Sequence, residues 1–238
     1  MNFIMDLHTH TIAAGHAYST LQENIAAAQN RGLQFLGLSE HGPAMPGGPH
    51  PYFFGNYKVI PRQYGNLRLL CGAEVNIMDY DGKLDLDQGI LEMLDYVIAS
   101  LHIPCVTPGT EAQNTRASIQ AMRNPYVKIL GHPDDFRYPL NRDEVVLAAK
   151  EEKVAIEINN SSLHPKSARQ GRKEVLELLE LYKKHRVEVL LGSDSHISYS
   201  VGNFDNIIPL LKETAFPAEL IMNVDPENIR KVVNVQLW

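Results

Sequence analysis

Short apolar runs alternate with segments of helical period along most of the chain, and this alternation predicts its secondary structure. Turn residues flank seven of the apolar runs, which predict strands over Phe3–Leu7, Phe35–Ser39, Leu67–Val75, Tyr96–Leu101, Val127–Leu130, Val154–Ile158 and Val187–Leu191. Apolar residues at helical spacing predict helices between these strands, over Leu21–Asn30, Ala112–Arg123, Arg142–Glu152 and Arg172–Lys184.

The order of these elements predicts an α/β fold. Strands that are apolar along nearly their whole length are typical of a parallel sheet covered by helices. Seven strand–helix repeats favour closure of the sheet into a TIM-like barrel, with an open doubly wound sheet as the alternative. Because the sequence has no Gly/Ser-rich linker, we expect one domain over residues 1–238. The longest irregular segment, Gly42–Asn56, is rich in Pro, Gly and aromatic residues and is a candidate lid over a site.

Composition and charge narrow the classes of partner. The 238 residues are 44% hydrophobic, which suffices for a large core, and the formal net charge is −6. Such a chain lacks the basic surface that binders of nucleic acid or anionic membranes use, so we expect neither partner. No apolar run reaches the roughly 18 residues of a membrane span. Cys71 and Cys105 are typical of core residues in a reducing compartment, so we expect a cytoplasmic protein; the sequence indicates no oligomeric state.

Histidines and carboxylates recur at the carboxyl ends of the predicted strands. Six of the seven strands end in such a group, and together they present His8, His10, His41, Glu74, His102, His132, Asp194 and His196. Because the carboxyl ends of parallel strands meet on one face of a barrel, we expect these side chains to converge. Burying so many ionisable groups without a metal would carry a large desolvation penalty. The pattern therefore predicts a metal site. The sixth strand ends in the polar residues of Glu157–Ser161, which we expect at the rim of this site rather than as strong ligands.

The number of candidate ligands bears on the number of ions. His16 follows the first strand in a loop, so it is either a ninth ligand or a surface histidine. Nine groups exceed the roughly three or four that one zinc ion takes from a protein, which suggests two or three ions that share a bridging carboxylate. Imidazole-rich coordination favours zinc, iron or manganese over magnesium. Clustered ions are typical of metal-assisted phosphoester hydrolysis, and the sequence contains no P-loop motif that competes with this interpretation.

Seven motifs that span about residues 5–200 resemble the PHP superfamily, named after polymerases and histidinol phosphatases; they are DLHTHT, LSEHGP, GAEVNI, ASLH, LGHPDD, EINNSS and LGSDSH. The chain is most similar to stand-alone phosphatases of the YcdX type. The resemblance implies a distorted (β/α)7 barrel with three divalent ions, zinc foremost and manganese or iron as alternatives, at the carboxyl ends of the strands. It assigns the ligands as His8, His10, Glu74 and Asp194 for one ion, Glu74, His102 and His132 for a second, and His16, His41 and His196 for a third.

The ligand pattern and the resemblance together predict hydrolysis of small phosphomonoesters by a hydroxide that a trinuclear metal cluster activates. The residues expected to take part in the chemistry are His8, His10, Glu74, Asp194 and His196. Loops after the fifth and sixth strands and the irregular segment offer candidate substrate contacts, namely Arg137, Lys166, Arg169 and His50. Asp6 and Ser195 are expected to orient ligands from behind.

Three other functions are alternatives on the sequence alone. A nuclease related to the polymerase-associated PHP proteins would use the same metals, although the acidic charge of the chain disfavours it. A dedicated histidinol-phosphate phosphatase is the second alternative. The third is a non-catalytic binding module that the metal cluster stabilises, against which the complete set of candidate ligands argues.

Overall fold

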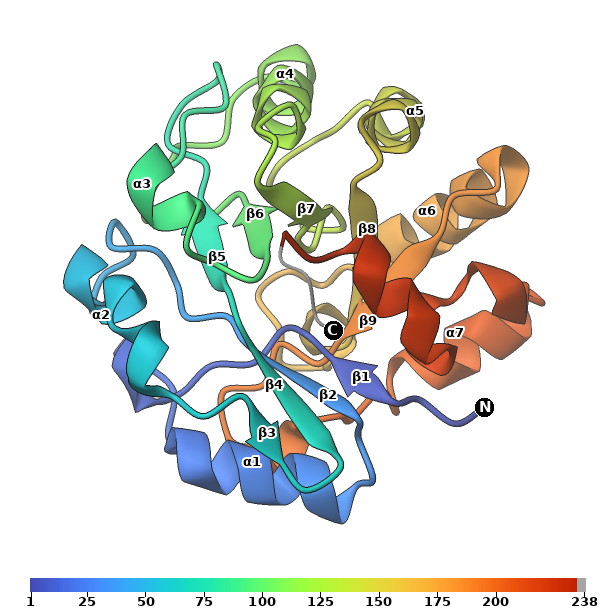
Figure 1. The fold of residues 1–238 in the computed structure, drawn as a ribbon. Coiled ribbons are helices and arrows are strands. Elements are labelled where there is room, and N and C mark those ends of the chain that lie inside the picture. The colour runs from blue at the N-terminus through green and yellow to red at the C-terminus, as the bar shows by residue number, and fades with distance from the viewer. Residues whose placement is uncertain (235–238) are drawn as a thin grey trace.

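The strands form two sheets in the computed structural model, which describes residues 1–234 (Figure 1). The first sheet has the order β1-β2-β4-β3, with β1 (Met5–Asp6), β2 (Phe35–Leu38), β3 (Gln63–Tyr64) and β4 (Leu67–Cys71). The second has the order β5-β6-β7-β8-β9, with β5 (Ala73–Asn76), β6 (Val97–Ser100), β7 (Val127–Leu130), β8 (Ala155–Asn159) and β9 (Val189–Gly192). Neighbouring strands are parallel except β3 and β4, which are antiparallel. The predicted α/β class with parallel sheets is confirmed.

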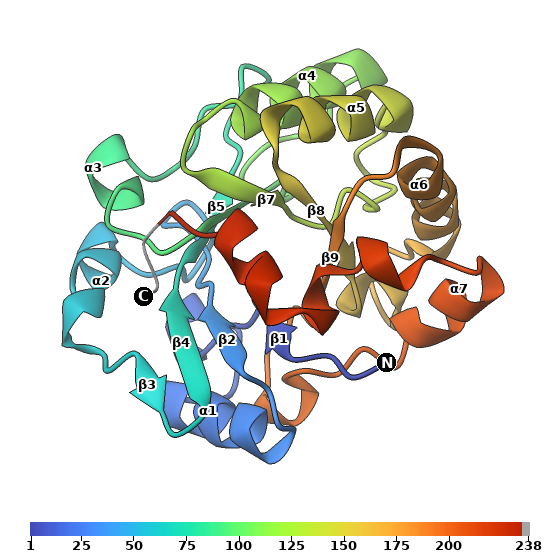
Figure 2. The ribbon, with the colours of Figure 1, turned by 45° about the vertical axis from the view of Figure 1, so that its right-hand side comes forward.

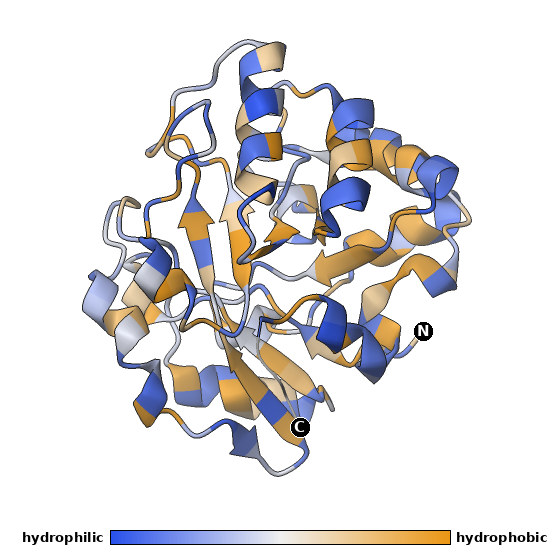
Figure 3. Cartoon of the chain, turned by 45° about the horizontal axis from the view of Figure 1, so that its top comes forward, coloured by the Kyte–Doolittle hydropathy of each residue, from blue (hydrophilic) through white to orange (hydrophobic). Residues whose placement is uncertain are grey.

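Helices surround the strands (Figure 1). They are α1 (Leu21–Asn30), α2 (Pro51–Gly55), α3 (Gln88–Leu91), α4 (Glu111–Met122), α5 (Arg142–Glu152), α6 (Arg172–His185) and α7 (Ile207–Glu213). Most strands are orange in Figure 3, whereas the helices carry both colours, as expected for helices that pack one face against a sheet. Within residues 1–234, no helix is both long and apolar enough to cross a lipid bilayer.

The two sheets adjoin at two seams, both near the carboxyl ends of their strands. At one seam, Thr9 beyond β1 pairs in parallel with Ser195 beyond β9. At the other, His41 beyond β2 pairs with Glu74 of β5, which follows β4 after the single residue Gly72. A side chain at residue 72 would collide with a buried tyrosine ring, so the crossing requires glycine. Because only isolated bridges join the sheets, the described strands do not form one closed sheet, and barrel closure stays a prediction.

Apolar side chains form a core on each face of the sheets, as the continuous apolar strands predict. The larger core lies between strands and helices and contains, for example, Leu38 and Leu179. The smaller core takes the alternate residues of the strands, such as Met5 and Ile129, which face the other way. Two short helical turns near the C-terminus, at Met222–Val224 and Pro226–Lys231, add apolar residues to this smaller core. This red segment lies across the strands in Figure 2.

Several predicted elements match the structure to the residue, namely Leu21–Asn30, Val127–Leu130 and Arg142–Glu152. The prediction of one strand over Leu67–Val75 is wrong, because Gly72 divides it into β4 and β5. The irregular segment Gly42–Asn56 contains helix α2 near its end. The sequence pattern does not predict β3, α3 and α7, which are all short.

Candidate metal centre

The segments that follow β1 and β9 run side by side and bring His8 and His10 close to Asp194 and His196. The His10 N–H donates to the Ser195 carbonyl over 2.8 Å, and the Ser195 N–H donates to the His8 carbonyl over 3.3 Å. Asp6 supports this pairing from behind, because its carboxylate accepts hydrogen bonds from the backbone of His8, Ser193 and Gly202. Asp6 and Ser195 thus contact the backbone of candidate ligands, and their orienting role stays a prediction.

Glu74 lies among five of the candidate ligand histidines. Its backbone is fixed at the seam, since its N–H donates to the Glu40 carbonyl over 3.0 Å. From its carboxylate oxygens, the nearest ring nitrogens lie at 3.3 Å for His8, 3.5 Å for His10, 2.7 Å for His41, 3.3 Å for His102 and 2.9 Å for His132. The five histidines follow four different strands and Glu74 lies on a fifth, so the fold brings together groups that are far apart in sequence.

Asp194 is a second carboxylate close to His8 and His10, and it also lies close to His196. Its Oδ1 lies 3.7 Å from His8 Nε2, 3.4 Å from His10 Nε2 and 3.5 Å from His196 Nδ1. The Nε2 atoms of His196 and His16 are 3.0 Å apart, although His16 is exposed. All nine predicted ligands therefore gather in one cluster. Three subsets each have ligand atoms within 4.8 Å of one another: His10–His41–His196, His8–His10–Asp194 and His41–Glu74–His102.

The donor atoms of the cluster fit divalent metal ions. In the described part of the chain, His8 Nε2, Glu74 Oε2 and both ring nitrogens of His10 and His41 are buried and have no hydrogen-bond partner. Buried polar atoms in native proteins are normally paired, so a set of unpaired atoms facing one another indicates that something else satisfies them. Imidazole nitrogens and carboxylate oxygens are the ligands that zinc and related transition metals prefer.

The charges in the cluster perturb one another strongly. Burial opposes ionisation of Glu74, but the nearby His8 and His102 outweigh it and hold the pKa of the carboxyl well below its usual range. Asp194 behaves alike, because Arg169 and His8 outweigh its burial and lower its pKa. In His10, by contrast, burial and the neighbouring histidines keep the pKa well below the usual value, so its ring is neutral and free to donate a lone pair.

Glu157 on β8 holds two of the candidate ligands, a role that the sequence did not reveal. Its Oε1 lies 2.6 Å from His8 Nδ1, and its Oε2 accepts from the His132 N–H over 2.8 Å and from Asn159 Nδ2 over 3.0 Å. A glycine at residue 192 makes room for it, since any Cβ there would overlap Glu157 Oε1. The available signal was a glutamate flanked by isoleucines in a buried strand.

The backbone is strained at two candidate ligands. His132 and Asp194 have positive φ angles of 27° and 53°, which non-glycine residues rarely adopt. Such strain persists only where surrounding contacts impose it, and it clusters at functional sites. At His132 the contact is its N–H bond to Glu157, and at Asp194 it includes the ion pair with Arg169.

Comparison with known proteins agrees with this geometry. A family model described as the PHP domain matches residues 6–219. This chain belongs to the PHP family. A probable phosphatase of Clostridium novyi is 51% identical to it over 230 residues, which are 96% of this chain and 93% of that protein.

Two solved structures resemble the fold of this PHP-family chain. One is the histidinol phosphate phosphatase of Lactococcus lactis in complex with zinc, L-histidinol and phosphate; its TM-score is 0.59 at 18% identity, covering 90% of this chain and 94% of that chain. The other is a chain of an archaeal ribonuclease P with mature tRNA, with a TM-score of 0.54 at 16% identity, covering 95% and 85%. At these identities the likeness shows the fold alone. The predicted family and the predicted phosphatase class agree with the curated relative.

The candidate substrate contacts of the PHP-family chain have differing surroundings. Arg137 is partly exposed and forms two parallel hydrogen bonds with Asp135, at 2.8 and 2.6 Å. Lys166 is exposed. The guanidinium of Arg169 contacts Asp194, Ser162 and Asn159, and its side chain is only 15% exposed. The ring of His50 accepts from the Tyr52 N–H over 3.2 Å and so caps helix α2.

Proposed function

We propose that the chain is a metal-dependent phosphoesterase that hydrolyses small phosphomonoesters. The observation that carries this proposal is the convergence of unpaired ring nitrogens on the carboxylates of Glu74 and Asp194. The curated relative called a probable phosphatase supports the reaction class. The zinc, L-histidinol and phosphate in the solved PHP-fold structure are in keeping with this combination of metal and substrate.

The proposed cofactor is a set of three divalent ions, zinc foremost, with manganese or iron as alternatives. We assign His8, His10, Glu74 and Asp194 to the first, Glu74, His102 and His132 to the second, and His16, His41 and His196 to the third. When bound, such ions lower the pKa of water and offset the charge of a phosphoryl group. The subsets of clustered ligand atoms, which share His10 and His41, support more than one ion.

The side chains around the cluster would position the ligands and the substrate. Glu157 holds His8 so that Nε2 faces the cluster, and Arg169 fixes one oxygen of Asp194 while the other faces His10. We therefore interpret Arg169 as a positioning residue. Arg137 is better placed for a phosphate, because Asp135 orients its guanidinium while part of it stays exposed.

We also propose that the two sheets act as one distorted seven-stranded barrel in a single domain, with β4 and β5 counted as one strand and the antiparallel β3 outside it. The parallel pairs Thr9–Ser195 and His41–Glu74 support this, because they join the sheets on both sides of the cluster. In such a fold the carboxyl ends of the strands form the rim of the active site. The candidate ligands all lie at that rim.

A phosphoester panel tests the proposed function. Protein depleted of metal with a chelator, then reloaded with zinc or manganese, is assayed against p-nitrophenyl phosphate, histidinol phosphate, a phosphodiester and a single-stranded oligonucleotide. We expect release of phosphate from monoesters only after reloading. Preferential cleavage of the oligonucleotide would favour the nuclease alternative, and no hydrolysis of any ester by the reloaded protein would contradict the proposal.

A further inference from the structure

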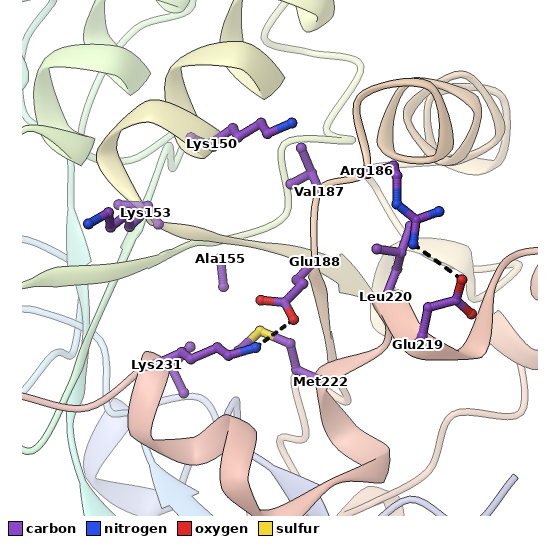
Figure 4. A pocket seen from close by; sticks show the side chains of 13 residues that line it. Lys150, Lys153, Ala155, Arg186, Val187, Glu188, Glu219, Leu220, Met222 and Lys231 are labelled. Carbon is purple, nitrogen blue, oxygen red and sulfur yellow. Dashed lines mark hydrogen bonds and ion pairs between the residues drawn. The ribbon is translucent and has the colours of Figure 1, made fainter.

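A cavity lies at the opposite end of the strands from the candidate metal centre (Figure 4). Its volume is about 560 Å³, within the roughly 300–1,000 Å³ typical of small-molecule sites. It is lined by the end of α5, the residues that lead into β8 and β9, and the C-terminal helical turns. Because the metal ligands follow the strands while this lining precedes them, the two sites are separate.

The cavity combines an apolar floor with a charged margin. The floor consists of residues that are less than a tenth exposed: Ala149, Val154, Ala155, Val187, Leu220, Met222 and Val232. The charged residues of the lining are Lys150, Lys153, Arg186, Glu188, Glu219 and Lys231. Figure 4 shows these side chains coming from several sides around Ala155. An apolar surface of this kind suits a flat organic group rather than a bare ion.

The margin carries an excess of positive charge. Lys231 pairs with Glu188 at 2.6 Å, and Arg186 pairs with Glu219 at 3.3 Å, so both carboxylates are neutralised. Within residues 1–234, Lys150 Nζ donates only to the backbone carbonyl of His185, over 2.7 Å. In the part of the chain that the structure describes, Lys153 has no hydrogen bond or ion pair through its side chain. Two lysines therefore have no carboxylate partner among the described residues, in a chain whose formal net charge is −6.

We propose that this cavity binds a small organic anion that carries an aromatic or other flat apolar body. The apolar floor would take the body, and Lys150 and Lys231 would contact the anionic group with Lys153 and Arg186 nearby. A neutral compound lacks the charge that matches the margin, and an inorganic anion lacks the body that covers the floor. The site is independent of the proposed phosphoesterase activity.

The test uses 1-anilinonaphthalene-8-sulfonate, an aromatic anion without a phosphoester bond, titrated into the metal-loaded protein and followed by its fluorescence. We expect one saturable site and an increase in dissociation constant of about tenfold in the double variant Lys150→Gln/Lys231→Gln. The matched control is Lys173→Gln/Lys128→Gln, whose lysines have equivalent partners, a glutamate for Lys173 and the Pro125 carbonyl for Lys128. We expect this control to bind as the wild type does.

Two further measurements keep the test decisive. N-phenyl-1-naphthylamine, which has the same rings without the sulfonate, should bind at least about tenfold more weakly. Inorganic phosphate, at a concentration that inhibits ester hydrolysis, should leave the fluorescence unchanged. Equal affinity of the two double variants, equal affinity of the neutral compound, or displacement by phosphate would overturn the proposal.

Discussion

His8 Nδ1 lies 2.6 Å from Glu157 Oε1, and both side chains are buried. A ring N–H that donates to a carboxylate leaves the lone pair on the other nitrogen, Nε2, which faces Glu74 at 3.3 Å. Strand β8, which carries no predicted metal ligand, therefore orients the ring of a candidate ligand that follows another strand. This relationship is the basis of the first two predictions.

Replacing Glu157 with glutamine should weaken metal binding by about 10- to 100-fold. The amide nitrogen of glutamine cannot accept the hydrogen bonds that Glu157 Oε2 now receives from His132 and Asn159. Competition with a chromogenic chelator measures the affinity, and the exposed Glu151→Gln serves as the matched control. Unchanged affinity in Glu157→Gln would show that the contact does not orient a ligand.

Alanine at residue 192 should lower both stability and metal content. Its Cβ would overlap Glu157 Oε1 and approach His8 Cβ to 3.0 Å, so the carboxylate must move off His8. Overpacking of this kind costs about 1–3 kcal/mol. Thermal unfolding and elemental analysis measure the two effects, with Gly89→Ala as the control because the space around residue 89 is open except for Asp87 at 3.5 Å. Wild-type metal content in Gly192→Ala would contradict the account.

Stability should fall as the pH rises towards 8 because of Glu40. Burial raises the pKa of this carboxyl to about 8, although Thr11 donates hydrogen bonds to it. In the unfolded chain the pKa is near 4.5, so between these values the folded state binds the extra proton. The contribution of Glu40 therefore declines with rising pH, by about 1.4 kcal/mol per pH unit within that window, and levels off above it.

The variant Glu40→Gln should remove this decline, because glutamine does not titrate and its carbonyl still accepts from Thr11. Chemical denaturation of both proteins at several pH values between 5 and 9 gives the difference in unfolding free energy, which isolates Glu40 from the titration of the histidines. Parallel curves for the two proteins would contradict the prediction.

Replacing Arg137 with glutamine should raise KM for a phosphomonoester by about tenfold, since a hydrogen bond to a charged group contributes about 1.5–3 kcal/mol. Metal content should not change, because Arg137 contacts Asp135 rather than a candidate ligand. Steady-state kinetics and elemental analysis test the two statements. The exposed Arg116→Gln is the control, and an unaltered KM in Arg137→Gln would remove Arg137 from the substrate site.

The sequence predicted much of the fold because periodicity and turn residues are local signals. Strand Val127–Leu130 and helix Arg142–Glu152 have clear patterns and clear ends, and the structure matches them. The division of Leu67–Val75 depends instead on the ring of Tyr96, which packs against Gly72 and lies 24 residues further along the sequence, just before β6. No pattern within that segment reveals such a contact.

The candidate site was predictable for a related reason. Chemically distinctive residues at strand ends converge through topology alone, so His8 and Glu74 were expected to meet although they are far apart in sequence. The functions of Glu157 and Arg169 were less accessible, because each depends on which side chain it faces. Arg169 forms an ion pair with Asp194. The sequence alone does not show whether this arginine pairs with a carboxylate or stays available to bind the phosphate of a substrate.

Elemental analysis of the protein tests the central claim most directly. After reloading and gel filtration, we expect the wild type to retain about three divalent ions per chain, and His10→Ala and Asp194→Ala to retain fewer and to lose phosphomonoesterase activity. His185→Ala, which removes a histidine bound to Asp143 outside the cluster, should retain the full set. A wild type without bound metal, or variants of His10 and Asp194 with wild-type metal content and activity, would contradict the account.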